Sequence, residues 1–82
     1  MSSEADPREL VLLLARSLVD QVDQVRVDEV PTARGTVLQL SVAPDDIGKI
    51  IGKDGRTAQA LRTLLNAATS RSGRRVQLDI LD

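Results

Sequence analysis

The stretch IGKIIGKDGR, residues 47–56, places three of the chain's five glycines within eight positions. Two of them, Gly52 and Gly55, lie between an aliphatic segment and a longer amphipathic segment. Because glycine adopts backbone conformations that other residues avoid, this pair predicts a sharp turn between two helices, with bare backbone at its surface. The N-terminus of the second helix would present unpaired N–H groups and a partial positive charge, which favour a phosphate.

Two other glycine motifs do not fit this spacing. A P-loop needs four residues between its first glycine and its Gly-Lys pair, and then Ser or Thr. Here only three residues separate Gly48 from Gly52, and Asp54 follows Lys53. A dinucleotide-binding fingerprint would need a glycine where Ile50 stands, and a strand before it. A sugar-phosphate backbone suits the turn better than either of these ligands.

Positive charge gathers around the same turn, although the net charge of the 82 residues is −1. Residues 48–75 hold seven basic side chains against one acid, Asp54, while the remainder holds four arginines against eleven acids. The seven are Lys49, Lys53, Arg56, Arg62, Arg71, Arg74 and Arg75. This segregation predicts a local site for an anion on an otherwise acidic body. The alternative is that these charges only keep the surface solvated.

Residue types that are absent exclude several functions. The chain has no cysteine and no histidine, so it lacks disulfides, zinc thiolates and the commonest general base. We therefore expect neither an enzyme nor a metal or other cofactor. It has no Phe, Trp or Tyr, which excludes aromatic platforms for stacking bases. The longest apolar run, residues 10–15, has six residues, which predicts no contact with a membrane and a cytoplasmic location.

Apolar periodicity predicts an α+β fold with the order α-β-β-α-α-β, in which three helices cover one face of a three-stranded sheet. The predicted helices cover 7–20, 47–51 and 56–69, and the predicted strands lie within 22–30, 36–42 and 75–81. The first two strands should form a hairpin. Asp6 should cap the first helix, and Asp45 or Asp46 should cap the second.

Two helical faces are predicted in more detail. The buried face of the third helix should consist of Leu61, Leu64, Leu65 and Ala68. In the second, Ile47 and either Ile50 or Ile51 should belong to the core rather than to a binding surface.

The first helix carries an unusually broad apolar surface. Its members are Leu10, Val11, Leu12, Leu14, Ala15, Leu18 and Val19. They cover roughly 200° of the helical wheel, wider than the stripe of ~100° that one core face needs, and Leu13 lies outside even this arc. Either the helix is wedged between the sheet and a neighbouring helix, or it buries a second face against another chain.

Taken together, these features resemble the KH-domain family. Residues 52–55, GKDG, match the GXXG loop of that family, and the isoleucines before them match its aliphatic helix. The element order is similar to the type II arrangement. The resemblance covers nearly the whole chain after residues 1–5, which we expect to form a flexible tail, so that residues 6–82 would form a single KH domain. It implies a loop that clamps about four nucleotides of a single strand.

The resemblance also implies roles for individual residues. The loop would grip the backbone of the strand, Gly48, Ile51, Arg56 and Thr57 would line one wall of the groove, and the segment SRSGRR would supply the opposite wall. Val76 and Leu78 would form the floor. With Lys49 added for its charge, the expected RNA-binding residues are Gly48, Lys49, Ile51, Gly52, Lys53, Asp54, Gly55, Arg56, Thr57, Arg71, Arg74 and Arg75.

Small bacterial proteins made of one KH domain resemble this chain in length. That resemblance implies an RNA-binding protein and RNA chaperone, which forms a homodimer. It also implies action with the larger RNA-binding protein KhpB, also called Jag, in the regulation of cell shape and peptidoglycan. The alternative is a homodimeric scaffold for protein–protein interaction with weak or no affinity for RNA, whose working surface would be the first helix. The clustering of basic residues around the glycine loop favours RNA binding.

Overall fold

The computed structural model describes residues 6–81, without the side chain of Ser72. Its helices are α1 (Pro7–Leu18), α2 (Ile47–Ile51) and α3 (Arg56–Thr69), and its strands are β1 (Arg26–Thr32), β2 (Gly35–Ser41) and β3 (Val76–Ile80). Short 3-10 turns lie at Val22–Gln24, Pro44–Asp46, Lys53–Gly55 and Ser70–Ser72. The predicted order α-β-β-α-α-β is confirmed. The flexible tail expected at residues 1–5 lies outside the described residues.

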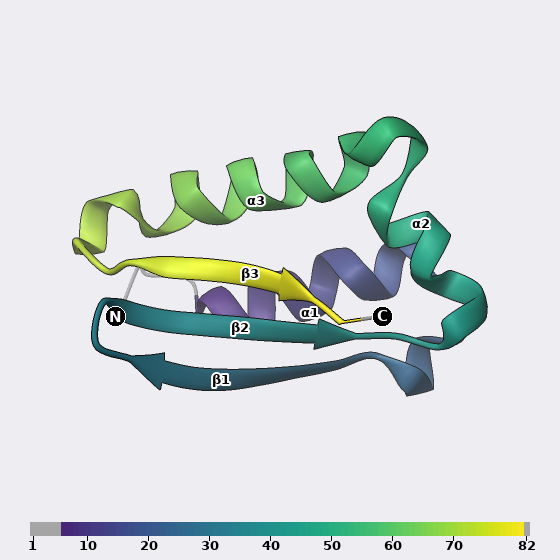
Figure 1. The fold of residues 1–82 in the computed structure, drawn as a ribbon, viewed down its shortest axis with the longest axis horizontal. Coiled ribbons are helices and arrows are strands. Elements are labelled where there is room, and N and C mark those ends of the chain that lie inside the picture. Colours follow the sequence, from purple (N-terminus) through teal and green to yellow (C-terminus); the bar gives the residue numbers. More distant parts are fainter. Residues whose placement is uncertain (1–5, 82) are drawn as a thin grey trace.

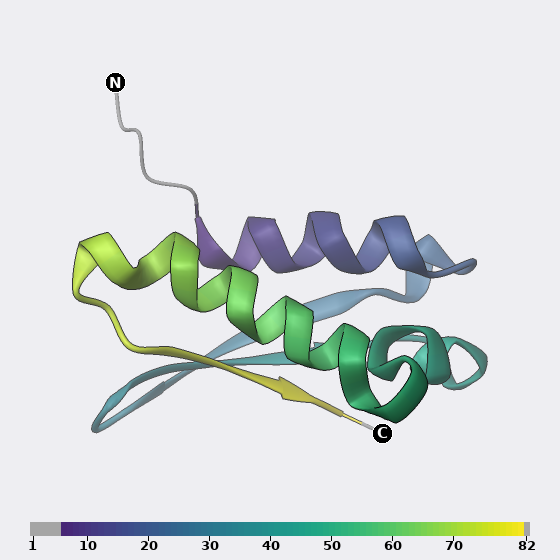
Figure 2. The ribbon, with the colours of Figure 1, turned by 90° about the horizontal axis from the view of Figure 1, so that it is seen from above.

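The three strands form one mixed sheet in the order β1-β2-β3. β1 and β2 pair antiparallel as the predicted hairpin, and β3 lies parallel to β2. A parallel neighbour requires a long crossover connection, which α2 and α3 supply. Figures 1 and 2 show α1 and α3 side by side over the same face of the sheet. The α+β arrangement expected from the sequence is therefore present, with β3 as the edge strand beneath α3.

Alternate side chains of the strands point toward the helices and form the core. The buried residues of the sheet are Val27, Leu38, Leu40, Val76 and Leu78, and those that the helices pack against them are Val11, Leu12, Ala15, Ile50, Leu61 and Leu65. Ile50 is fully buried while Ile51 is 37% exposed, which confirms that one of these two isoleucines belongs to the core. At the start of α1, Asp6 caps the helix as predicted, because its carboxylate accepts the N–H of Arg8 at 3.0 Å.

The broad apolar surface of α1 is mostly covered within the chain. The helix ends at Leu18, two residues earlier than predicted, because Val19 adopts an extended backbone with φ −100° and ψ 162°. Val11, Leu12 and Ala15 are buried between the sheet and α3, whereas Leu13 is 67% exposed. The wedge between sheet and neighbouring helix thus accounts for most of the arc but not for Leu18, which is 39% exposed, and Leu13, which lies outside the arc, also stays exposed.

The predicted apolar face of α3 is partly wrong. Leu61 and Leu65 are buried, but Leu64 is 50% exposed and Ala68 is also exposed. The buried stripe consists of Ala58, Leu61, Leu65 and Thr69, so the helix is rotated away from Leu64. Thr69 can lie in this stripe because its hydroxyl donates to the carbonyl of Leu65 at 2.9 Å, which satisfies the buried polar group.

Candidate nucleic-acid interface

Gly52 ends α2 in a conformation that few other residues could adopt. Its backbone has φ 74° and ψ 175°, a combination found essentially only in glycine. Its N–H donates to the carbonyl of Gly48 at 2.8 Å. A Cβ at this position would lie 2.2 Å from Oγ1 of Thr57. The absence of a side chain therefore lets the first turn of α3 pack directly against the end of α2.

The loop continues through two residues in the left-handed region. Asp54 has φ 57° and Gly55 has φ 75°, and the N–H of Gly55 donates to the carbonyl of Gly52 at 3.2 Å. No side chain caps the N-terminus of α3 at Gly55. The N–H of Arg56 donates to the carbonyl of Lys53, and the next N–H groups of the turn can donate to water or a ligand. Lys53 and Arg56 are exposed at the same point. Bare backbone, a helix N-terminus and two cations are thus brought together.

The other residues predicted around this loop flank it on both sides. On α2, Gly48 is exposed, with open space where a side chain would stand, and Ile51 is partly exposed beside Gly52. On α3, Thr57 is half-buried because it packs on Gly52. Together they form a continuous surface next to the loop.

Lys49 is directed away from this surface. Its ammonium group pairs with the carboxylates of Asp20 and Asp46, the latter at 3.2 Å. Asp46 is 1% exposed and also accepts the N–H of Gln21 at 3.0 Å. The prediction that Asp45 or Asp46 caps α2 is therefore wrong, because no side chain caps α2. Asp46 instead binds the segment between α1 and β1.

These contacts change the protonation equilibria of both groups. The hydrogen bond from the Gln21 backbone and the pairing with Lys49 hold the pKa of Asp46 below its ordinary value, although burial acts in the opposite direction. The two carboxylates, Asp20 foremost, raise the pKa of Lys49. Both groups are thus charged at neutral pH, and they join α2 to the end of α1.

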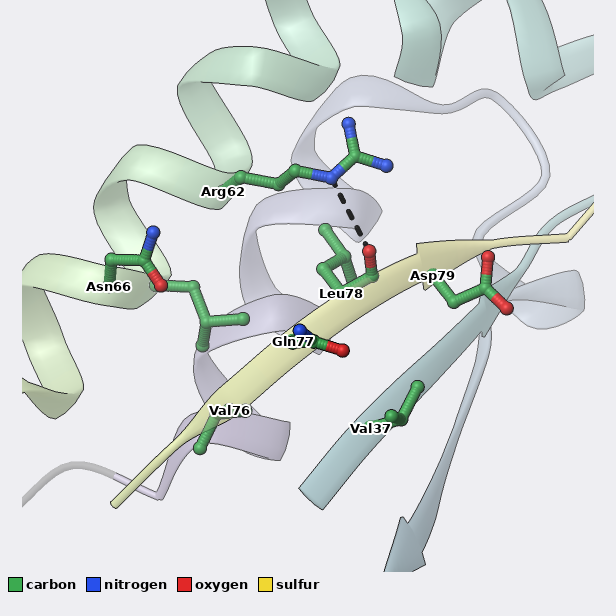
Figure 3. A pocket seen from close by; sticks show the side chains of 8 residues that line it. Val37, Arg62, Asn66, Val76, Gln77, Leu78 and Asp79 are labelled. Atoms are coloured by element: carbon green, nitrogen blue, oxygen red, sulfur yellow. Dashed lines mark hydrogen bonds between the residues drawn. The ribbon is translucent and has the colours of Figure 1, made fainter. Parts of the chain in front are cut away.

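A groove of about 440 Å³ runs between α3 and the edge strand β3. Its residues are Val37, Arg62, Leu65, Asn66, Val76, Gln77, Leu78 and Asp79. Figure 3 shows Arg62 reaching from α3 across the groove, where its Nε donates to the carbonyl of Leu78 at 3.3 Å. Val76 and Leu78, the expected floor, do line this groove. The amide groups of Asn66 and Gln77 and the carboxylate of Asp79 supply hydrogen-bond donors and acceptors along it.

The predicted arginines lie at the opposite end of α3 from the glycine loop. Arg71, Arg74 and Arg75 are exposed in the segment between α3 and β3, which turns at Gly73 with φ 71°. Since α3 has 14 residues, about 21 Å of helix separates them from the loop. The loop and the arginines therefore do not face each other; they lie at the two ends of α3, as Figure 1 shows.

Sequence reasoning did not single out Arg62, Asn66, Gln77 or Asp79 as site residues. Arg62 is counted only among the basic residues near the turn, and Gln77 and Asp79 are the outward positions of an alternating strand. The signal that could have found them is their type and spacing, because polar residues at 62 and 66 share one face of the helix. What the sequence does not reveal is that this face borders the edge strand.

Other kinds of site find no support in the part of the chain that the structure describes. Residues 6–81 contain no cluster of three carboxylates, histidines or cysteines that could hold a metal ion. Within the same range, none of the helices has both the length and the apolar character needed to cross a membrane.

Comparison with known proteins agrees with this arrangement. Residues 8–80 match the family model described as "KhpA/KhpB, KH domain". A curated relative from Halalkalibacterium halodurans, named RNA-binding protein KhpA, is 52% identical over 73 residues, which cover 89% of this chain and 96% of the relative. Relatives with the same name from Treponema pallidum and Borreliella burgdorferi are 49% and 47% identical over 74 residues, covering 90% of this chain and 92% and 90% of the relatives. By the family match, the relatives and the fold, this chain belongs to the KhpA/KhpB family of KH domains.

Proposed function

We propose that this chain binds single-stranded RNA, with the loop at residues 52–55 holding the sugar-phosphate backbone and the groove between α3 and β3 taking the bases. The observation that carries the proposal is the loop itself. Gly52 and Gly55 have positive φ values, no side chain caps the N-terminus of α3, and Lys53 and Arg56 are exposed beside it. A phosphate is the ligand that such an arrangement favours.

The comparisons support the same proposal. The family is one of KH domains and not of enzymes, and the curated relatives are named RNA-binding proteins. In KH domains the GXXG loop clamps about four nucleotides of the backbone. We therefore assign residues 6–82 to a single domain with one RNA groove.

In the proposed complex, phosphate contacts supply most of the affinity and the groove supplies modest base preference. Lys53 and Arg56 neutralise the phosphates at the loop, and the arginines at the other end, Arg71, Arg74 and Arg75, extend the positive surface. Bases would lie against the aliphatic floor, since the chain has no aromatic side chain, with Asn66 and Gln77 within reach of their edges. Binding should weaken as salt rises, because each phosphate contact releases counterions.

Lys49 takes a different part from the one expected of it. Its ammonium already pairs with Asp20 and Asp46, so a phosphate would have to displace two carboxylates. We propose that Lys49 holds α2, and with it the glycine loop, in position, and that it adds little direct contact with RNA.

We also propose for this chain the partner protein and the cellular role that its resemblance to the family implies. The family description joins KhpA with KhpB, which supports KhpB as the partner protein, and RNA chaperone activity and a role in cell shape and peptidoglycan regulation would follow from that partnership. A cytoplasmic location stays a prediction.

A homodimeric scaffold is the second candidate function. The observation in its favour is the set of exposed leucines on adjacent helices, Leu13 and Leu18 on α1 and Leu64 on α3. Large apolar side chains that stay exposed on neighbouring elements often mark contact with another protein. The two functions are compatible, because a dimer would join two weak RNA sites, and their combined avidity would exceed the affinity of either site alone.

The test is an anisotropy titration of a labelled single-stranded RNA of ten uridines, at about 50 and 200 mM salt. Lys53→Asp should weaken binding about tenfold or more, because it replaces a charge-assisted contact by repulsion. Arg16→Asp is the matched control, because this substitution makes the same change of charge at an exposed position on α1.

Equal loss of affinity in both variants would mean that only net charge matters, and the loop would not be the site. Unchanged binding by Lys53→Asp would refute the loop assignment directly. If the wild type binds no RNA at either salt concentration while sedimentation finds a dimer, the scaffold function replaces RNA binding.

A further inference from the structure

The turn between β1 and β2 is locked against the segment that precedes β3. Oγ1 of Thr32 accepts the N–H of Arg34 at 3.3 Å and donates to the carbonyl of Gly35 at 3.1 Å. The N–H of Thr36 donates to the carbonyl of Arg75 at 2.9 Å. The turn therefore has a fixed shape and a fixed neighbour.

Gly35 is what permits this contact. Its φ is +145°, and a Cβ at this position would lie 2.2 Å from the carbonyl oxygen of Arg75. Because the backbone of the turn approaches that of Arg75 so closely, Arg34 and Arg75 come to the same end of the molecule although 41 positions separate them. Figures 1 and 2 show this end, where the hairpin turn and the start of β3 lie opposite the end that carries α2.

A second hollow of about 330 Å³ lies at this end. It is lined by residues 32–37 of the hairpin and by Arg75 and Gln77. Two of its side chains, Arg34 and Arg75, are cationic, and no carboxylate is among its lining residues. Within residues 6–81, neither guanidinium pairs with a carboxylate, and both side chains are exposed. The hollow thus offers two arginines, together with the hydroxyl of Thr36, to an anion.

The hollow continues the groove between α3 and β3. Val37 and Gln77 line both of them, and these two residues are partners in the pairing of β2 with β3. The groove lies between Arg62, Leu65 and Asn66 of α3 and residues 76–79 of β3. The glycine loop lies at the start of α3, so a strand that leaves the loop and follows α3 passes along the groove toward the hairpin.

We infer that Arg34 and Arg75 form a second phosphate site, which holds the RNA strand where it leaves the groove. A guanidinium matches a phosphate with two parallel hydrogen bonds, and the two arginines need no rearrangement of ion pairs to make them. Since the GXXG loop and groove accommodate about four nucleotides, the phosphate in question belongs to a nucleotide beyond those four. The occupant is the backbone of the same strand, because the hollow and the groove share Val37 and Gln77 as lining residues. This inference rests on the proposed function.

RNAs of two lengths test it. Labelled strands of four and of ten uridines are titrated into the wild type, Arg34→Gln and the control Arg16→Gln, which removes the same charge from α1. Arg34→Gln should weaken binding of the ten-nucleotide strand about threefold to tenfold and leave the four-nucleotide strand unchanged. The salt dependence should change as well. On single strands, each phosphate contact contributes about 0.7 to the slope of log affinity against log salt concentration. A variant that lacks one contact should therefore lose about 2.6-fold less affinity than the wild type when salt rises from about 50 to 200 mM.

Amide spectra provide an independent readout and a check of folding. The N–H signals of Arg34 and Arg75 should shift with the ten-nucleotide strand and stay in place with the four-nucleotide strand. Inorganic phosphate at the same phosphate concentration should move them much less, because it lacks the anchoring of the strand in the groove.

Three results would overturn the inference. Arg34→Gln could bind the longer strand like the wild type, it could lose affinity equally for both strands, or Arg16→Gln could lose as much. Each of these leaves the proposed function standing, because the wild type would still bind RNA through the loop. If the wild type binds neither strand, the proposed function fails and the hairpin site fails with it.

Discussion

Replacing each glycine of the loop region by alanine separates three physical situations within eight residues. Gly52 has a positive φ and a close neighbour, Gly55 has a positive φ and open space, and Gly48 has open space in a helix. The same added methyl group therefore meets backbone strain plus a clash, strain alone, or neither. The loss in free energy of unfolding should therefore be largest for Gly52→Ala and smaller for Gly55→Ala, and Gly48→Ala should cause no loss.

The magnitudes come from the local geometry. At Gly55, with φ 75° and ψ 12°, alanine costs about 1–2 kcal/mol because it must adopt the left-handed helical conformation. At Gly52, the combination of φ 74° and ψ 175° costs about 1–3 kcal/mol, and the Cβ would stand 2.2 Å from Oγ1 and 2.9 Å from the backbone nitrogen of Thr57. Overpacking of this kind adds about 1–3 kcal/mol. Gly48→Ala should instead stabilise the protein by about 0.5–1 kcal/mol.

Urea denaturation followed by circular dichroism measures the three differences. With a shift of about 4–8 °C per kcal/mol for a domain of this size, melting curves should resolve all of them as well. If Gly52→Ala were no less stable than Gly55→Ala, Thr57 would not pack on Gly52 and the described loop would be wrong. Gly48→Ala also separates stability from binding, because its methyl group would project into the surface proposed to meet RNA.

Two further predictions concern stability. Asp46→Asn should lower the urea midpoint, and the free energy of unfolding of the variant should fall less steeply than that of the wild type as the pH is lowered (the acid limb of the stability curve). Because the pKa of Asp46 is lowered, the wild-type contribution is complete above the ordinary carboxyl pKa of 3.8 and is lost as the pH falls from there through the lowered pKa of the folded state. An unchanged acid limb in the variant would contradict the role given to Asp46. Leu65→Ala should cost about 2–5 kcal/mol and Leu64→Ala less than about 1 kcal/mol, measured by the same urea curves; equal losses would contradict the rotation described for α3.

The sequence predicted those structural features that depend on residues close together in the chain. The bounds of α3 agree with the prediction, because the left-handed backbone of Gly55 before the helix is a property of glycine itself. The alternation of apolar and polar residues in β3 likewise predicts which of its side chains point inward. The cap at Asp6 likewise depends only on Arg8, two residues away. Where one residue and its near neighbours determine the structure, the sequence was sufficient.

Contacts between distant segments decided the rest. A helical wheel places Leu61, Leu64 and Leu65 on one broad face, but only packing against β3 and α1 selects which part of it is buried. Asp46 has the position of a helix cap, yet its carboxylate binds backbone 25 residues away. No local pattern distinguishes these outcomes, and the prediction failed at both.

The same distinction explains how a chain with a net charge of −1 can attract a polyanion. Lys49 is neutralised by Asp20 and Asp46, whereas exposed basic side chains lie at the glycine loop, on α3 at Arg62 and at the hairpin turn. Most of the acids belong instead to the part of the chain before α2, and β1 is the strand farthest from β3. For the proposed RNA complex, we expect this charge distribution to favour a strand that approaches along α3 over one that approaches from the β1 side, because the field of the charges acts before contact forms.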